Sequence, residues 1–189
     1  MARPKTELRR KYIHLIGLVV PVLYWATNQW VTLCFVAFFL LLFIAAEFYR
    51  MRHGIPKEAE AIAKPLMRPQ EKRGIGGHVF FAAGAFIAML VYSKEIAITA
   101  ILISVLADGG AAVVGSMWGR HKLVGKKTLE GSLTLFLIAI ALAAWLVEPL
   151  LAALAGAIVA ACVELLPMND NLTVPIAAGL AMHAVRYLS

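Results

Sequence analysis

Cysteine is scarce in this sequence. Its 189 residues include two cysteines, Cys34 and Cys162, and both fall in apolar stretches. Two such thiols usually behave as small hydrophobes, so they predict neither a disulfide framework nor a cysteine-based metal site. A cleavable signal segment is not evident either. The first apolar run is followed at once by a second, so we expect both to be retained as helices.

Charge is also sparse. Only 15% of the residues are charged, whereas 61% are hydrophobic, and the mean hydropathy is +0.80. A soluble domain is nearer half apolar. The composition therefore predicts an all-α integral membrane protein, with residues 1–189 forming a single polytopic domain and no internal repeat.

Seven stretches are apolar enough to be membrane-spanning helices. A span needs roughly 20 such residues, with about 17 to 25 tolerated. We therefore expect about seven transmembrane helices. Their approximate limits are 12–28, 30–48, 77–93, 96–117, 131–147, 149–166 and 172–188.

The basic residues set the expected orientation. The net charge is +7, and all 18 lysines and arginines except Lys94 and Arg186 lie in the N-terminal segment or in loops of one side. The positive-inside rule predicts the N-terminus inside, the C-terminus outside, and cytoplasmic loops at about 49–76, 118–130 and 167–171. We expect a protein of the cytoplasmic membrane with its polar chemistry facing the cytoplasm. A nucleic-acid partner is not expected.

Two basic blocks lie on this cytoplasmic side. In the first, Arg10 and His14 are four residues apart and would share one helix face. The second contains Arg68, Glu71 and Lys72 and ends in glycines before a helix, where backbone amides can approach an anion. The alternatives are a positive-inside membrane anchor for the first block and a flexible basic loop for the second.

Asp108 is the most informative residue of a third block, because it lies inside the apolar run 96–117. A carboxylate in such a place marks a functional site by default. A glycine-rich stretch follows it, then two lysines and a second acidic residue, up to Ser132. This composition suits phosphates and a divalent cation, although the spacing is not that of a Walker A loop. The alternative is close helix packing, which would explain Gly109 and Gly110 but not the acids.

A fourth block brackets a proline turn between the last two helices. It contains Glu164, Asp170 and Asn171. Magnesium sites often combine one or two carboxylates with substrate phosphates. The alternatives are that Asp170 caps the last helix and that Glu164 extends its carboxylate to the membrane surface. Elsewhere, Glu47 is expected to pair with Arg50, three residues on.

Together the four blocks resemble the CTP-dependent membrane lipid-alcohol kinases, the group of dolichol kinase, phytol kinase and CTP-dependent diacylglycerol kinase. The third block also resembles phosphatidate cytidylyltransferases. The fourth block favours the kinases, since it lacks the Lys-Asp and Asp-rich ending of the cytidylyltransferases. The kinase resemblance implies CTP as donor, a lipid alcohol in the bilayer as acceptor (a polyprenol-like isoprenoid or diacylglycerol), and a divalent cation, expected to be Mg²⁺.

The resemblance also implies roles for individual residues. It makes Asp108, Glu164 and Asp170 catalytic carboxylates, of which Asp108 and Asp170 would hold the metal. The residues expected to bind the nucleotide or its phosphates are Arg10, His14, Arg68, Glu71, Lys72, Gly115, Gly119, Lys126, Lys127, Thr128, Glu130, Gly131, Ser132 and Asn171.

Two points stay open at this stage. A small transporter is the alternative outside enzymology, but transporter sites usually lie near the membrane midplane. Asp108 would lie about 10–15 Å from the inner end of its helix, which is off-centre. In addition, Gly156 stands among alanines and offers a close-packing face, so a homodimer is a candidate assembly.

Overall fold

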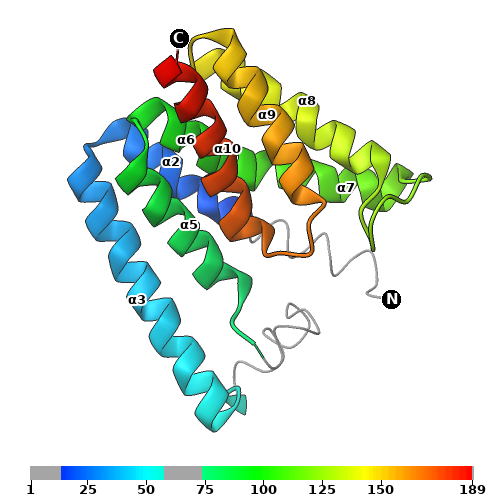
Figure 1. Cartoon of the computed structure of the whole chain (residues 1–189). Coiled ribbons are helices and arrows are strands. Elements are labelled where there is room, and N and C mark those ends of the chain that lie inside the picture. Colours follow the sequence, from blue (N-terminus) through cyan, green and yellow to red (C-terminus); the bar gives the residue numbers. More distant parts are fainter. Residues whose placement is uncertain (1–13, 58–73, 189) are drawn as a thin grey trace.

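The computed structural model describes residues 14–57 and 74–188, and this part of the chain is helical throughout its main segments (Figure 1). Helices occupy all seven predicted stretches. Their bounds are η1 Leu15–Leu18, α2 Val19–Ala26, α3 Gln29–His53, α5 Gly77–Val91, α6 Lys94–Leu102, η2 Ile103–Ala107, α7 Asp108–Trp118, α8 Leu129–Leu146, α9 Leu150–Glu164 and α10 Asp170–Leu188.

Local sequence signals set several of these bounds. The side chain of Asn28 accepts a hydrogen bond from the amide of Val31, 3.0 Å away, and so caps the start of α3. Gly54 ends the same helix with φ 82°, a left-handed conformation that glycine adopts without steric cost. Thr128 caps α8 by accepting from the amide of Gly131.

Within residues 14–57 and 74–188, three helical segments are long and apolar enough to cross a membrane: Gln29–His53, Lys94–Trp118 and Leu129–Leu146. Three others, Leu15–Ala26, Gly77–Val91 and Leu150–Glu164, are apolar but have only 10 to 17 residues. A 15-residue helix is about 22 Å long, which is shorter than a hydrocarbon core of about 30 Å. The chain is thus an all-helical membrane protein, and the count of seven spans remains a prediction, as does the orientation.

The segment Lys94–Trp118 forms the centre of the molecule. It consists of α6, one π-helical stretch (η2) and α7, and α6 is buried on all sides from Ile96 to Ile101. A helix that is apolar all round is typical of a core position. The π-helical stretch ends at Ala107, directly before Asp108. Such stretches are often found at functional sites.

The helices that follow fold back on one another in sequence. Helix α8 packs on α7, α9 on α8 and α10 on α9, and α10 also packs on α5, while α3 lies at the edge against α5 (Figure 1). The expected close-packing face at Gly156 is used within the chain. A Cβ atom there would clash with the side chain of Met182 of α10, so Gly156 is not left open for a second copy.

The two ends of the bundle differ in character. At one end the loop connections are short, and Trp25 stacks on Trp145 with their ring centroids 6.2 Å apart. At the other end the α7–α8 and α9–α10 connections meet the start of α5. The described parts of the α7–α8 and α9–α10 connections and the start of α5 therefore gather at one end, and most of the described site residues lie there.

Candidate functional site

Lys127 is the centre of the candidate site. It lies in the connection between α7 and α8, and its ammonium group contacts two carboxylates from the neighbouring α9–α10 connection. Its Nζ atom is 2.6 Å from Oε1 of Glu164 and 2.7 Å from Oδ2 of Asp170. One cation thus joins residues that are far apart in the sequence.

Glu164 is the more deeply placed of the two acids. Its side chain is 3% exposed at the C-terminal end of α9, and its second oxygen, Oε2, accepts a hydrogen bond of 3.0 Å from the hydroxyl of Ser132 on α8. Glu164 is therefore a buried, fully engaged carboxylate, and the idea that it extends to the membrane surface is wrong.

The two carboxylates also act on Lys127. Burial by itself would lower the pKa of the lysine, but Asp170 and Glu164 outweigh it and raise the pKa above the ordinary 10.5. Lys127 is consequently charged at neutral pH, which is what a group that binds phosphates requires.

Asp108 and Asp170 complete the acidic part of the site. Asp108 is buried at the start of α7, and its charge acts on Asp170 at the start of α10. The Oδ1 atom of Asp170 is buried and has no hydrogen-bond partner among the described residues. Helix capping falls to the preceding residue, since Oδ1 of Asn169 accepts from the amide of Asn171 at 3.2 Å. Asp170 thus does not serve as the cap, and its carboxylate faces the site.

The glycines of the third block bring α7 and α8 close together. A Cβ atom on Gly131 would lie 2.9 Å from the carbonyl oxygen of Ala111 and 3.5 Å from the Cα atom of Gly115. A Cβ atom on Gly119 would clash with the carbonyl oxygen of Gly115 and with Thr128. These three glycines permit a close helix crossing. Close packing was the alternative explanation for Gly109 and Gly110. Gly109 has open space at its Cβ position, whereas a Cβ atom on Gly110 would press on the side chain of Ile138.

Two other predicted residues of this block, Glu130 and Lys126, have different surroundings. Glu130 turns to His121, with 2.8 Å between Oε1 and Nδ1, and also accepts from the backbone amide of His121. Lys126 is exposed, whereas Thr128, two residues further on, is buried. Glu130 is thus paired outside the cluster formed by Lys127, Glu164 and Asp170, which we call the Lys127 cluster.

Two further predicted residues anchor neighbouring elements. The Nδ2 atom of Asn171 donates to the carbonyl oxygen of Gly77, 3.0 Å away, and so ties the start of α10 to the start of α5. The Nε2 atom of His14 lies 3.1 Å from the carbonyl oxygen of Ser104, one turn before Asp108. The remaining predicted residues, Arg10, Arg68, Glu71 and Lys72, lie outside the described part of the chain.

Some features were not expected from the sequence. The bonds of Lys127 to Glu164 and Asp170 join distant segments, and no local sequence pattern predicts them. The role of Ser132 as a donor to Glu164 is of the same kind. His121 as partner of Glu130 could have been suggested by their closeness in a short loop.

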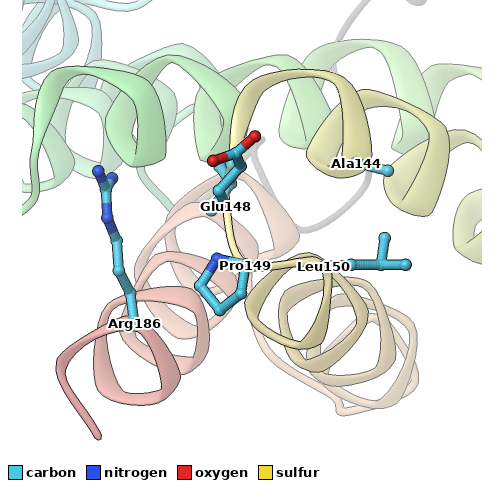
Figure 2. A pocket seen from close by; sticks show the side chains of 6 residues that line it. Ala144, Glu148, Pro149, Leu150 and Arg186 are labelled. Atoms are coloured by element: carbon cyan, nitrogen blue, oxygen red, sulfur yellow. The ribbon is translucent and has the colours of Figure 1, made fainter. Parts of the chain in front are cut away.

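Two further observations concern metal binding and the position of a surface hollow. Within residues 14–57 and 74–188, no group of three or more His, Cys, Asp or Glu side chains is arranged to hold a metal ion on its own. A hollow of about 600 Å³ lies at the opposite end of the bundle, where Glu148 and Arg186 reach it from the α8–α9 turn and from α10 (Figure 2). It contains none of the predicted site residues.

Comparison with known proteins supports the kinase resemblance over part of the chain. Over 74 residues, which are 38% of this chain, it is 38% identical to CTP-dependent diacylglycerol kinase 1 of Schizosaccharomyces pombe. The match covers 34% of that kinase, so the chain spans about a third of its length. Over 202 aligned positions, covering 96% of both chains, it is 24% identical to an uncharacterized protein of Rickettsia prowazekii. No family model and no solved structure matches the chain.

Proposed function

We propose that this protein is a CTP-dependent kinase that phosphorylates the hydroxyl group of a membrane lipid alcohol. The observation that carries the proposal is the Lys127 cluster with Asp108 beside it: one cation, the two buried acids Asp108 and Glu164, and the partly buried Asp170, at one end of an apolar helical bundle. The partial similarity to a CTP-dependent diacylglycerol kinase supports both the donor and the class of acceptor.

The arrangement suits phosphoryl transfer in chemical terms. This reaction depends mainly on positioning and on neutralising phosphate charge, and needs little covalent chemistry from the protein. Lys127 is the charged donor for the phosphates. Glu164 holds it in place and is itself held by a hydrogen bond from Ser132. One of the carboxylates accepts the proton of the lipid hydroxyl, which arrives from the bilayer.

Asp108 and Asp170 fit a divalent cation. Asp170 has a buried oxygen with no hydrogen-bond partner among the described residues, and Asp108 lies near enough to act on it electrostatically. Magnesium is commonly held by one or two carboxylates together with substrate phosphates, so a third protein ligand is not required. When bound, Mg²⁺ would neutralise the charge that develops on the transferred phosphoryl group.

The proposal includes a location. We place the site at the cytoplasmic side, where the positive-inside rule puts the N-terminal segment and the loop 49–76. The cations Arg10, Arg68 and Lys72 of those segments would add phosphate contacts. Access of a reagent that cannot cross membranes to a cysteine introduced at exposed Lys126, compared in sealed and opened vesicles of known orientation, tests this placement.

Product analysis tests the reaction. The purified full chain is incubated with CTP or ATP, Mg²⁺, and either diacylglycerol or a polyprenol. A kinase releases CDP and a lipid monophosphate. A cytidylyltransferase supplied with phosphatidate instead releases pyrophosphate and a CDP-lipid, and that outcome would replace the kinase proposal.

A substitution tests the site. Asp108→Asn is expected to reduce kcat by 100-fold or more, on the order expected when a preorganised charge is lost from a reaction centre. The matched control is Glu95→Gln, an exposed acid near Arg186 that is remote from the Lys127 cluster, and it should retain full activity. Unchanged turnover in Asp108→Asn would remove Asp108 from the reaction.

A further inference from the structure

Glu47 is a buried acid near the C-terminal end of the apolar helix α3. Its Oε2 atom accepts two hydrogen bonds from Arg50, at 3.0 Å from Nε and 2.5 Å from Nη2. An acid within an apolar helix is costly to bury and usually pairs with another polar group. Here the partner points away from α3, because Nη2 of Arg50 also donates to the carbonyl oxygen of Gly74, 2.6 Å away.

The Glu47–Arg50 pair therefore holds residues 74–78, which lead into α5 and include its first two positions; we call them the lead-in segment. Besides the bond to Gly74, Oε1 of Glu47 lies 3.4 Å from Nε2 of His78. A Cβ atom on Gly76 would lie 2.9 Å from the same oxygen and closer still to the His78 ring, so a larger residue would force these side chains to move. The lead-in segment is thus bound from one side by two groups of α3.

Its other side meets the candidate site. The carbonyl oxygen of Gly77 accepts the hydrogen bond from Asn171, and Asn171 follows Asp170, which binds Lys127. A continuous series of contacts therefore runs from Arg50 through residues 74–77 to the first turn of α10. The planar guanidinium of Arg50 can bind Glu47 and Gly74 at once, which a lysine ammonium on a flexible stem does poorly.

We propose that Glu47 and Arg50 are positioning residues: they fix the lead-in segment, and through Asn171 they fix the first turn of α10, which carries Asp170. They act at a distance from the reacting groups. The proposal rests on the kinase function above for its effect on nucleotide use, whereas its structural part does not.

Hydrogen exchange of the purified full chain tests the structural part. Arg50→Lys keeps the charge but should lose the contact with either Glu47 or Gly74. The backbone amides of residues 74–80 and 170–174 should therefore exchange faster. Arg52→Lys is the matched control, because Arg52 is exposed on the same helix and lies over the ring of Phe48. Unchanged exchange at 170–174 in Arg50→Lys would overturn the proposal.

Kinetics test the consequence for the site. Arg50→Lys is expected to lower kcat/KM for CTP about tenfold, the effect of roughly one lost hydrogen bond, with KM for the lipid unchanged. Combined with Asn171→Ala, it should cost little more than the larger single change, because both act along one path. Equal losses for CTP and lipid, or additive losses, would indicate a general structural role instead.

The two proposals can fail separately. A wild-type protein that transfers no phosphoryl group to any tested lipid would overturn the kinase function and the kinetic consequence. The exchange experiment would still decide whether Glu47 and Arg50 position the first turn of α10.

Discussion

Replacing Lys127 by methionine is the most informative perturbation of stability. Methionine keeps most of the aliphatic length of lysine and removes its charge. Glu164, which is 3% exposed, and Asp170, which is 14% exposed, would then be left without the cation that both contact. The expected result is a large loss of stability, because an acid buried without its partner keeps its desolvation cost and loses the compensating attraction.

The magnitude follows from burial. Removing one partner of a buried ion pair costs about 3–5 kcal/mol. The Lys127 side chain is 30% exposed, which lets water screen part of the interaction, so we expect about 3 kcal/mol. The pKa of Lys127 is raised above 10.5, so this contribution is fully present below about pH 10.5 and is lost as pH rises through the folded pKa.

Unfolding of the full chain in mixed micelles, followed at neutral pH, measures the effect. Lys126→Met is the matched control, because this neighbouring lysine is exposed and should change stability by less than about 0.5 kcal/mol. Adding Glu164→Gln to Lys127→Met should recover at least about 1 kcal/mol, since a neutral amide tolerates burial better. A loss below about 1 kcal/mol for Lys127→Met, or no recovery in the double variant, would refute the reasoning.

Three further substitutions test packing and a buried hydrogen bond by the same unfolding measurement. Gly131→Ala should destabilise the chain by about 1–3 kcal/mol, because its Cβ atom would press on a backbone carbonyl oxygen. Gly109→Ala has open space and should be neutral or stabilise the chain by up to about 1 kcal/mol. Equal effects of the two substitutions would contradict the close crossing of α7 and α8. Tyr92→Phe removes the 2.7 Å bond from the tyrosine hydroxyl to the carbonyl oxygen of Ile176 and should cost about 1 kcal/mol, and a neutral result would show that this bond adds nothing between α5 and α10.

Helix positions could be predicted from the sequence because hydrophobic length is a local property. Each predicted stretch contains a helix, and caps such as Asn28 and Thr128 shift the bounds by a few residues. The number of membrane crossings could not be settled in this way. Several helices of about 15 residues are apolar enough to be buried, yet too short to span a bilayer unaided.

The candidate site was predictable in composition but not in pairing. Asp108 and Glu164 stand out in the sequence because acids in apolar helices are rare, and both are buried in the structure. The bonds of Lys127 depend on how α8, α9 and α10 pack, which no window of sequence contains. The pairing of Glu130 with His121 is different, because it is a contact within one short loop that the sequence could have suggested.

The geometry of the Lys127 cluster assigns different tasks to its two acids. Glu164 uses both oxygens, one on Lys127 and one on Ser132, and is almost inaccessible to water, so replacing either bond would cost buried hydrogen bonding. Asp170 uses one oxygen on Lys127 and keeps the other without a hydrogen-bond partner among the described residues. In the proposed kinase, an incoming phosphate would therefore take the place of Asp170 on Lys127 at the smaller cost, while Glu164 keeps the lysine in position. Lys127 would then exchange only one partner during the proposed reaction.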